Sequence, residues 1–556
     1  MDSFIISPGA GAIVAAFLVV GYLLYLAAFP KPIPGIPYHK ESARRLGGDL
    51  PRLFDAIRNK VSLADYLARQ PDELGSPIVQ IFLKPFSHPI VILVDPRECH
   101  DIMVRRAREF DRSNGWKDIF TGTMPNNHLV LSTGERFRAQ RKLLMDTMAP
   151  QFLHTVAATH AFTQCLHLIK AWRLKSDLGG GRPFDLGDDI TELALEIIWS
   201  VAFGSDLGTI KRQCIFLEER PHINRPADID QLIRIPRPRL PDDHLAVMHL
   251  LDGIEVAIMT PSYRKAKAHK DKLIQDRLDD AKLRSLDPQD AESANKVNSA
   301  SDFLVFRECR AAEKEGRSPQ VDSPEAKDEL FGFLVAGHET TSGAIQWGVK
   351  YLADNPAVQT KLRADLHAAC DMYHQSGELP SAEAIIKADL PYLDAVIEEI
   401  LRLGNVVPTQ ARTTTHDTEV LGRHIPRGVD LIMTTAGAAS TDGKYDVPDW
   451  DPADIAAFMP ERWLKSNHET GALQFNPLAG TSRPFGAGIR GCFGRKLALL
   501  ELRLIFFIVC WCFELPRLPK MLSSYEATSK LANKPAHCFG RPIWQGIRVG
   551  EQHSTT

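Results

Sequence analysis

A cysteine set among glycines near the C-terminal end is the part of this sequence best suited to chemistry. The segment reads Phe485-Gly-Ala-Gly488-Ile-Arg490-Gly-Cys492-Phe-Gly494. A thiolate that binds a metal needs a lowered pKa and backbone N–H donors around its sulfur. Gly488 and Gly494 let the backbone curl close to that sulfur. Phe485 can shield it from water, and Arg490 can meet a carboxylate. The apolar periodicity of residues 493–509 predicts a helix whose positive end points toward Cys492.

Two other interpretations of this segment are open. Gly486-x-Gly488-x-x-Gly491 matches a dinucleotide-binding fingerprint, which would make the protein a dehydrogenase. That fingerprint needs a buried strand before it and a β-α-β unit around it, and residues 476–484 do not resemble a strand. Cys492 could also be a structural thiol, the usual role of a lone cysteine.

A second group of reactive side chains lies in the middle of a long predicted helix. Ser323 can cap this helix, Pro324 suits its first turn, and Asn355-Pro356 would stop it. At 1.5 Å per residue the helix is roughly 45 Å long. Its centre reads Ala336-Gly337-His338-Glu339-Thr340-Thr341. Glycine costs about 1 kcal/mol inside a helix. The group therefore indicates either a local opening of the helix for function, or close packing at Gly337 with both threonines bonded to their own backbone.

His338-Glu339 also begins like the zinc-protease motif H-E-x-x-H. Ser342 occupies the place of the second histidine, so the sequence excludes this class of site.

The spacing Phe-x-x-Gly-x-Arg-x-Cys-x-Gly resembles the haem-binding signature of the cytochrome P450 family. Five fixed residues at this spacing should arise by chance in such a chain on the order of once in ten thousand. The resemblance runs from about residue 30 to the end. Further motifs follow in the family's order: Gly134-Glu-Arg-Phe137-Arg-Ala-Gln-Arg141, the segment 336–341, Glu399-Ile-Leu-Arg402 and Pro460-Glu-Arg462-Trp463. It implies one mostly α-helical domain with a small β region.

The resemblance also implies roles for individual residues. Cys492 would be the axial ligand of the haem iron, with Phe485, Gly488, Arg490 and Gly494 forming its loop. Phe137, Arg141 and Arg412 would contact the haem propionates, and Glu339 and Thr340 would be the distal acid–alcohol pair that delivers protons. Two departures stand out: Phe137 replaces a commoner Trp, and Trp463 replaces a commoner Phe.

The family's activity would be insertion of one oxygen atom from O2 into an organic substrate. A P450-type isomerase or dehydratase that does not use O2 is the alternative, but Thr340, which we expect such a member to lack, is present. Little chain follows residue 494, so the electrons of NADPH would come from a separate membrane-bound NADPH–cytochrome P450 reductase, with cytochrome b5 as a further candidate. Arg136, Arg138, Lys142, Arg495 and Lys496 could form the docking face.

The expected pocket walls are mostly apolar or small and predict a lipophilic substrate: residues 114–131, Phe333, Val335, Ala336 and residues 406–409. The segment PGIPYHKESARRLGGDLP resembles members from filamentous fungi that tailor secondary metabolites.

Composition fits an ordinary globular protein. The chain has 556 residues, 44% hydrophobic and 24% charged, and a net charge of −3, which gives no indication of a nucleic-acid partner. Its 9 cysteines are scattered without a CxxC pair, so neither a disulfide framework nor a zinc ribbon is expected.

Residues 9–29 carry no charge, and about 20 apolar residues can span a bilayer. A cleaved signal peptide is the alternative, but Asp2 is the only charge before the run. Lys31, Lys40, Arg44 and Arg45 follow it, which predicts a cytosolic body on the endoplasmic reticulum membrane. We therefore expect an anchor at 1–29, a proline-rich hinge at 30–46 and a catalytic domain at 47–556.

The remaining patterns predict hairpins at 77–95 and 418–433, and helices at 188–203 and 361–373. Residues 233–241 and 285–301 are expected to be surface loops.

Overall fold

The computed structural model describes residues 8–220, 230–239, 261–285, 297–434, 450–451, 453–467, 469–529 and 532–549. The chain forms two compact units. Unit 1 comprises Met1–Asn114 and Thr409–Ala439, and unit 2 comprises Gly115–Pro408 and Ser440–Thr556. The described residues are mostly helical with short strands, which confirms the predicted fold class. The boundaries predicted at residues 29 and 46 stay predictions.

Unit 1 is built on a five-stranded sheet. Its order is β1-β2-β8-β5-β3, with β2 and β8 parallel and the other pairs antiparallel. The strands are β1 (Ile78–Ile81), β2 (Ile90–Leu93), β3 (Phe110–Arg112), β5 (Gln410–Thr414) and β8 (Asp430–Met433). The hairpin predicted at 77–95 is confirmed by the β1–β2 pair. The hairpin predicted at 418–433 is shorter than expected: β6 (Thr418–Val420) pairs with β7 (Arg423–Ile425), while β8 joins the large sheet.

The helices of unit 1 are α1 (Pro8–Ala27), α2 (Leu50–Arg58), α3 (Leu63–Leu74) and α4 (Pro96–Val104), with a short turn η1 (Ser42–Arg44). Ser62 caps α3 and Asp95 caps α4, because their side-chain oxygens accept the first free backbone N–H groups. Tyr66 and Leu67 of α3 pack against Val79 and Ile92 of the β1–β2 hairpin. Burial of these apolar side chains holds α3 on the sheet.

The helix α1 covers most of the run predicted to span a membrane. Its apolar side chains are exposed, for example Phe17 at 75% and Leu18 at 69%. Nevertheless, none of the helices in the described ranges meets the combined length and hydropathy required for crossing a bilayer. The prediction of a membrane-spanning helix at 9–29 is therefore not supported.

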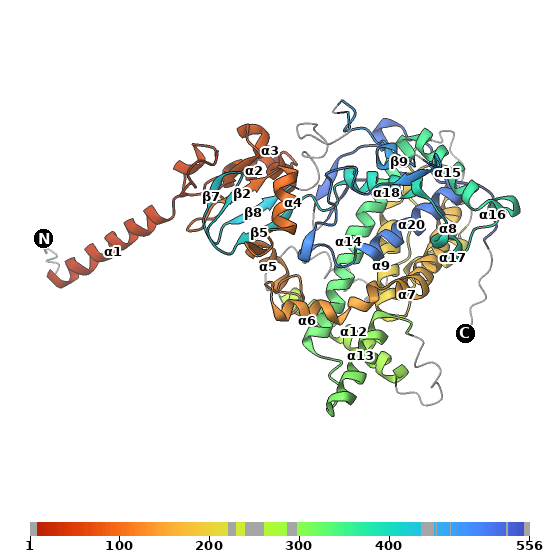
Figure 1. The fold of residues 1–556 in the computed structure, drawn as a ribbon, viewed down its shortest axis with the longest axis horizontal. Helices are drawn as coiled ribbons and strands as arrows, with labels where there is room; N and C mark the ends of the chain where they lie inside the picture. Colours follow the sequence, from red (N-terminus) through yellow and green to blue (C-terminus); the bar gives the residue numbers. More distant parts are fainter. Residues whose placement is uncertain are drawn as a thin grey trace. The chain divides into compact units, whose positions relative to one another are not determined.

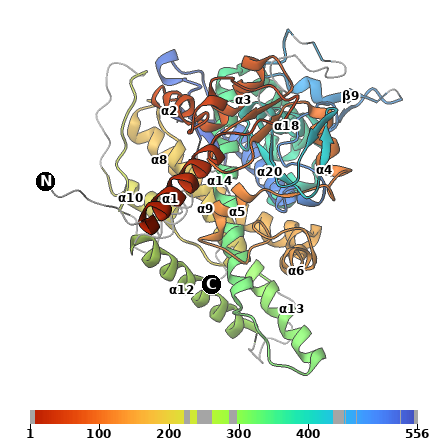
Figure 2. The same ribbon diagram turned by 90° about the vertical axis from the view of Figure 1, so that its left-hand side faces the viewer.

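Unit 2 contains most of the helices, and Figure 1 shows α14 passing among α9, α18 and α20. Figure 2 shows α12 and α13 side by side near one end of α14. The α-helices are α5 (Asn114–Thr121, which starts at the unit boundary), α6 (Glu135–Leu143), α7 (Pro150–Phe152), α8 (Ala158–Gly179), α9 (Gly187–Phe203), α10 (Thr209–Glu218), α12 (Pro261–Ser285), α13 (Ala300–Glu315), α14 (Pro324–Asp354), α15 (Pro356–Ala369), α16 (Asp371–Ser376), α17 (Ala382–Lys387), α18 (Pro391–Gly404) and α20 (Arg495–Cys512). The helices predicted at 188–203 and after Cys492 are confirmed, whereas the one predicted at 361–373 breaks at Cys370.

The short helices and strands of unit 2 complete the fold. The 3-10 turns are η2 (Met145–Met148), η6 (Pro460–Trp463), η7 (Gly488–Arg490) and η8 (Lys520–Leu522), and η3 (Leu153–Ala157) is a π-turn. The strands pair as β4 (Phe184–Asp185) with β14 (Phe539–Gly540), β9 (Leu464–Ser466) with β10 (Leu473–Phe475), β11 (Phe513–Glu514) with β15 (Ile543–Trp544), and β12 (Ala527–Ser529) with β13 (Asn533–Pro535). Of the two predicted loops, residues 233–239 are irregular, and 240–241 and 286–296 lie outside the described residues.

The 31-residue helix α14 is the centre of unit 2, and its predicted ends are confirmed. Ser323 Oγ accepts the N–H of Ala326, and Asn355 ends the helix. The helix is continuous, so the local opening considered for its centre is not found. Gly337 instead permits close packing, because a Cβ there would lie 2.6 Å from the Ile198 side chain of α9. A Cβ at Gly348 would meet Phe506 of α20 at 2.2 Å.

Candidate functional site

The segment around Cys492 folds into a tight loop that leads into α20. Gly486 and Gly488 adopt positive φ angles of 63° and 66°, which other residues adopt only with strain. The Cys492 N–H donates to Phe485 O at 2.8 Å and closes the loop. The loop is not preceded by a strand at 476–484, so the dinucleotide-binding interpretation is wrong.

Cys492 differs from the other cysteines in its accessibility. All nine cysteines are free thiols, seven are buried, Cys309 is half-buried, and Cys492 is exposed. Protein atoms still crowd the sulfur, and this desolvation raises the pKa of the Cys492 thiol. The backbone N–H of Gly494 and the charges of Arg141 and Arg495 oppose the rise without cancelling it. The protein's own residues therefore raise the pKa of this thiol, and the lowered pKa expected for a metal-bound thiolate stays a prediction. A coordinated metal ion would deprotonate the thiol itself.

Arg141 ties α6 to the cysteine loop. Its Nη1 donates to Ile489 O at 2.7 Å. Its guanidinium lies 5.7 Å from the ring centre of Phe137 and 5.5 Å from that of Phe493. The structure thus brings Phe137 and Arg141 against the loop of Cys492, while their predicted contact with the haem propionates stays a prediction.

Arg490 connects the same loop to the chain before α6. Its Nε donates to Thr133 Oγ1 at 2.9 Å, and its Nη2 donates to Leu131 O at 2.8 Å. The guanidinium lies 3.9 Å from the ring centre of Phe137, which is buried. Phe137 therefore acts through its ring face as a cation–π partner, whereas the family's usual Trp would also offer an N–H donor. A carboxylate contact for Arg490 stays a prediction.

His128 and Glu329 also border this cluster, and sequence reasoning missed both. Glu329, near the start of α14, accepts the His128 N–H at 2.6 Å and pairs with its Nδ1 at 2.7 Å. The His128 ring lies 5.7 Å from that of Phe493. The pair joins residues 201 positions apart, and no local pattern marks it.

Arg412 lies in unit 1 on β5. It is buried, and its Nη1 donates to Ala411 O at 2.8 Å. Its predicted contact with a propionate stays a prediction.

The middle of α14 carries the predicted acid–alcohol pair. Thr340 Oγ1 donates to Ala336 O, one turn earlier, at 2.6 Å. Glu339 Oε2 lies 2.8 Å from Lys534 Nζ of β13, a residue that the sequence motifs did not identify. Thr340 therefore follows the backbone-bonded interpretation, and Glu339 is held by a partner from another element.

The side-chain hydroxyl of Thr341 bonds to another helix, so Thr341 departs from the interpretation that both threonines bond to their own backbone. Its Oγ1 donates to Glu501 Oε2 of α20 at 3.2 Å. Burial raises the pKa of Glu501 to about 8, and burial lowers the pKa of His338, which precedes Thr341 on α14, to about 3. Both groups are therefore neutral at pH 7, which lowers the cost of burying them between the helices.

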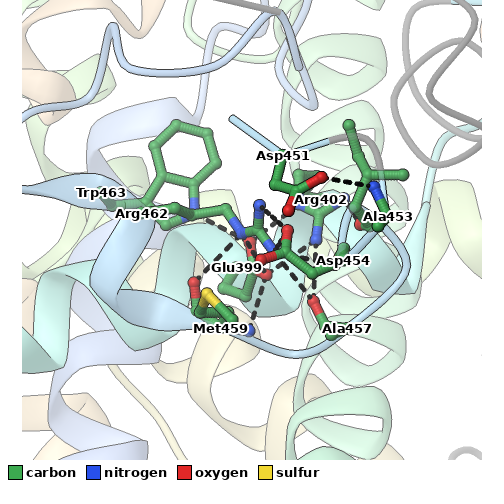
Figure 3. Close-up of polar contacts among 10 residues, drawn as sticks. Glu399, Arg402, Asp451, Ala453, Asp454, Ala457, Met459, Arg462 and Trp463 are labelled. Carbon is green, nitrogen blue, oxygen red and sulfur yellow. Dashed lines mark hydrogen bonds and ion pairs between the residues drawn. The ribbon is translucent and has the colours of Figure 1, made fainter. Parts of the chain in front are cut away.

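A network of charged side chains joins α18 to the segment 454–463 (Figure 3). Glu399 and Arg402 of α18 form two hydrogen bonds of 2.7 and 2.8 Å, and both side chains are fully buried. Arg462 Nε lies 3.2 Å from Glu399 Oε1, and Trp463 Nε1 donates to Glu399 Oε2 at 2.8 Å. Trp463 therefore supplies a hydrogen bond that the family's usual Phe lacks.

Arg402 extends the same network to the backbone. It donates to Ile455 O at 2.7 Å and to Ala457 O at 3.2 Å, and Arg462 bonds Asp454 (Figure 3). Since every polar atom involved is buried or half-buried, the network fixes residues 454–463 against α18.

The predicted pocket-wall residues of α14 differ in accessibility. Phe333 and Val335 are buried, while Ala336 is exposed. The helix packs against α6, which Arg141 ties to the cysteine loop, and against α20, which follows that loop.

Comparison with known proteins gives one family. The model of the family "Cytochrome P450" matches residues 66–536. The cytochrome P450 monooxygenase GME11363 of Pestalotiopsis microspora is 33% identical over 96% of this chain and 98% of its own length. TRI13 of Fusarium sporotrichioides is 33% identical over 93% of this chain and 96% of its own length, and xilC of Penicillium rubens is 35% identical over 93% of both. Both carry the name cytochrome P450 monooxygenase.

Proposed function

The chain belongs to the cytochrome P450 monooxygenases, enzymes whose cofactor is haem, and on this premise we propose that it inserts one oxygen atom from O2 into a lipophilic organic substrate. The placement of Cys492, an exposed residue in a tight glycine-rich loop, is the observation that carries the proposal.

The residues around Cys492 suit a haem with one thiolate ligand. Cys492 would bind the iron, and Phe485, Gly488 and Gly494 would shape the loop that presents its thiolate. Arg141 and Arg490 would hold the anionic edge of the cofactor, with Phe137 packed against the guanidinium of Arg490. The propionate contact of Arg412 in unit 1 is proposed from the sequence motif alone. When bound, haem supplies the activation of O2, which a thiolate ligand favours.

The protein's own residues would position the substrate and deliver protons. Glu339 and Thr340 lie on the same turn of α14, and Thr340 Oγ1 keeps its acceptor capacity while donating to Ala336 O. A water bonded to Thr340 would pass on a proton that the Glu339 carboxylate has first taken up from solvent. The apolar Phe333 and Val335 favour a lipophilic substrate near this turn.

The proposed role is a tailoring step in fungal secondary metabolism. The fungal sources of the relatives and the fungal character of the N-terminal segment support it. Spectral titration of the purified protein with a panel of candidate metabolites would identify the substrate.

We propose a separate NADPH–cytochrome P450 reductase as electron donor, with cytochrome b5 as a further candidate. Arg136, Arg138, Lys142, Arg495 and Lys496 are all exposed, which suits a basic docking face for an acidic partner.

We also propose that α1 attaches the protein to the endoplasmic reticulum membrane with its catalytic body in the cytosol. Phe17, Leu18 and Tyr22 are 61–75% exposed, and exposed apolar side chains of this size favour a lipid environment. Deletion of residues 1–29 should release the protein from microsomes. Resistance of the full chain to alkaline carbonate would indicate spanning, whereas extraction would indicate attachment to the surface. Retention of the deletion variant on membranes would contradict the role of α1.

The decisive experiment replaces the iron ligand. Cys492→Ser should abolish the red-shifted carbon monoxide difference band that marks a thiolate ligand. Cys510→Ser and Cys512→Ser are matched controls, because both residues are buried in α20 and should leave the band in place. Retention of the band in Cys492→Ser would refute the assignment.

A further inference from the structure

Asn533 fixes the C-terminal hairpin of β12 and β13 to α14 and to the residues at the end of α18. Its N–H donates to Val406 O at 2.8 Å, and its Nδ2 donates to Gly404 O at 3.2 Å. Its own O accepts Trp347 Nε1 of α14 at 3.0 Å. Three hydrogen bonds to two other elements leave this residue little freedom.

Gly343 lets the hairpin approach α14 closely. A Cβ at Gly343 would lie 3.2 Å from Asn533 O and 3.4 Å from Lys534 Cγ. The stem of Lys534 is therefore packed against the helix backbone one turn after Glu339. A lysine normally loses much conformational freedom when it pairs with a carboxylate, and here packing has already restricted its stem.

The ammonium of Lys534 reaches Glu339. The distance from Nζ to Glu339 Oε2 is 2.8 Å, and each side chain is 15% exposed. His338 is the other titratable group near this carboxylate among the described residues, with Nδ1 at 3.7 Å from the same oxygen. Because burial lowers the pKa of His338 to about 3, its ring is neutral and Lys534 is the cation that faces Glu339.

We propose that Lys534 is a positioning residue for proton delivery: it holds the Glu339 carboxylate in one orientation beside Thr340 and balances its charge. The inference rests on the proposed function of Glu339. Without Lys534, the carboxylate of Glu339 would be half-buried without a cation and would turn toward water. Proton delivery along α14 would then lose its fixed geometry, although the helix and the cysteine loop would remain intact.

The first test measures how strongly Lys534 and Glu339 are coupled in the stability of the protein, with no catalysis involved. Lys534→Met, Glu339→Gln and the double variant are unfolded in urea as haem-loaded protein, with helicity as the signal. We expect strong non-additivity, with the double variant unfolding at a higher urea concentration than the sum of the single changes predicts. The control cycle uses Lys361 and Glu461, which have the same N–O distance of 2.8 Å but are 41% and 46% exposed, and it should be close to additive. Additive behaviour of Lys534 and Glu339 would overturn the inference.

The second test asks whether the pair matters beyond packing. Haem-loaded protein without added substrate is reduced by purified NADPH–cytochrome P450 reductase, and hydrogen peroxide per NADPH is measured in H2O and D2O. Lys534→Met should raise the peroxide yield several-fold and change the solvent isotope effect on NADPH oxidation. Lys534→Arg keeps a cation and should restore both values.

The outcomes separate this inference from the proposed function. Lys534→Met could unfold non-additively and still show the peroxide yield and isotope effect of the wild type. The pair would then be a structural contact only, which would overturn this inference but not the proposed function. A wild-type protein without the thiolate band would overturn the proposed function and this inference with it.

Discussion

Replacing Trp463 by the family's usual Phe tests how much the buried network around Glu399 contributes to stability. The indole Nε1 donates to Glu399 Oε2 at 2.8 Å, and both side chains are fully buried. A hydrogen bond to a charged group contributes about 1.5–3 kcal/mol, and burial removes the screening that would reduce this value. The smaller Phe ring adds a cavity term on the order of 1 kcal/mol, since Trp450 and Gly480 pack against the indole.

Trp463→Phe should therefore lower the free energy of unfolding by about 2.5–4 kcal/mol. The assay is urea unfolding of the haem-loaded protein, followed both by helicity and by the thiolate carbon monoxide band. Trp450→Phe is the matched control, because its ring packs against Trp463 and the guanidinium of Arg462 without being the donor to Glu399. A loss below about 0.5 kcal/mol, the level of an ordinary surface substitution, would refute the hydrogen-bond argument.

Three further predictions concern the helices and the surface of unit 2. Thr340→Ala should keep the ferrous carbon monoxide band, because its bond to Ala336 O adds little to an intact helix, but it should raise peroxide per NADPH; unchanged peroxide would leave Thr340 a packing residue. For Glu501, burial raises the pKa of the carboxyl from 4.5 to about 8, so the folded protein keeps a proton that the unfolded chain releases between these values. The contribution of Glu501 to the free energy of unfolding is complete below about pH 4.5 and is lost as the pH rises through about 8. Glu501→Gln should therefore flatten the pH dependence of urea unfolding between these values. An unchanged slope in this variant would contradict the prediction. Lys142→Glu should slow reduction by purified reductase and weaken its salt dependence, because Lys142 is an exposed cation of the proposed docking face; a rate insensitive to both charge and salt would argue against that face.

Predictions from local patterns were the most successful. The ends of α14 follow from Ser323, Pro324 and Asn355, whose capping and helix-stopping properties need no tertiary contact. The β1–β2 hairpin and α9 likewise follow from periodicity. The hairpin at 418–433 was wrong in part, because the pairing of β8 with β2 joins residues far apart in sequence.

The centre of α14 shows where local reasoning ends. A glycine and two threonines inside a helix are equally consistent with a local opening and with close packing. The close approach of Ile198 to Gly337 distinguishes them and shows packing. Thr340 and Thr341 are chemically identical neighbours, yet one bonds to Ala336 of its own helix and the other to Glu501 of α20. Their directions around the helix, about 100° apart, expose them to different neighbours.

The sequence by itself determined the family, because the chemistry of a thiolate loop depends on glycines, an arginine and a cysteine at short, fixed spacing. It also predicts Cys492 as the iron ligand. Tertiary structure alone decided the partners of the acidic side chains. Lys534 meets Glu339 across 195 positions, and His128 meets Glu329 across 201. A carboxylate pairs with any cation, or accepts a hydrogen bond from any donor, that folding brings within about 3 Å. Its partner therefore depends on how the helices and the C-terminal hairpin pack, and no local sequence pattern predicts it.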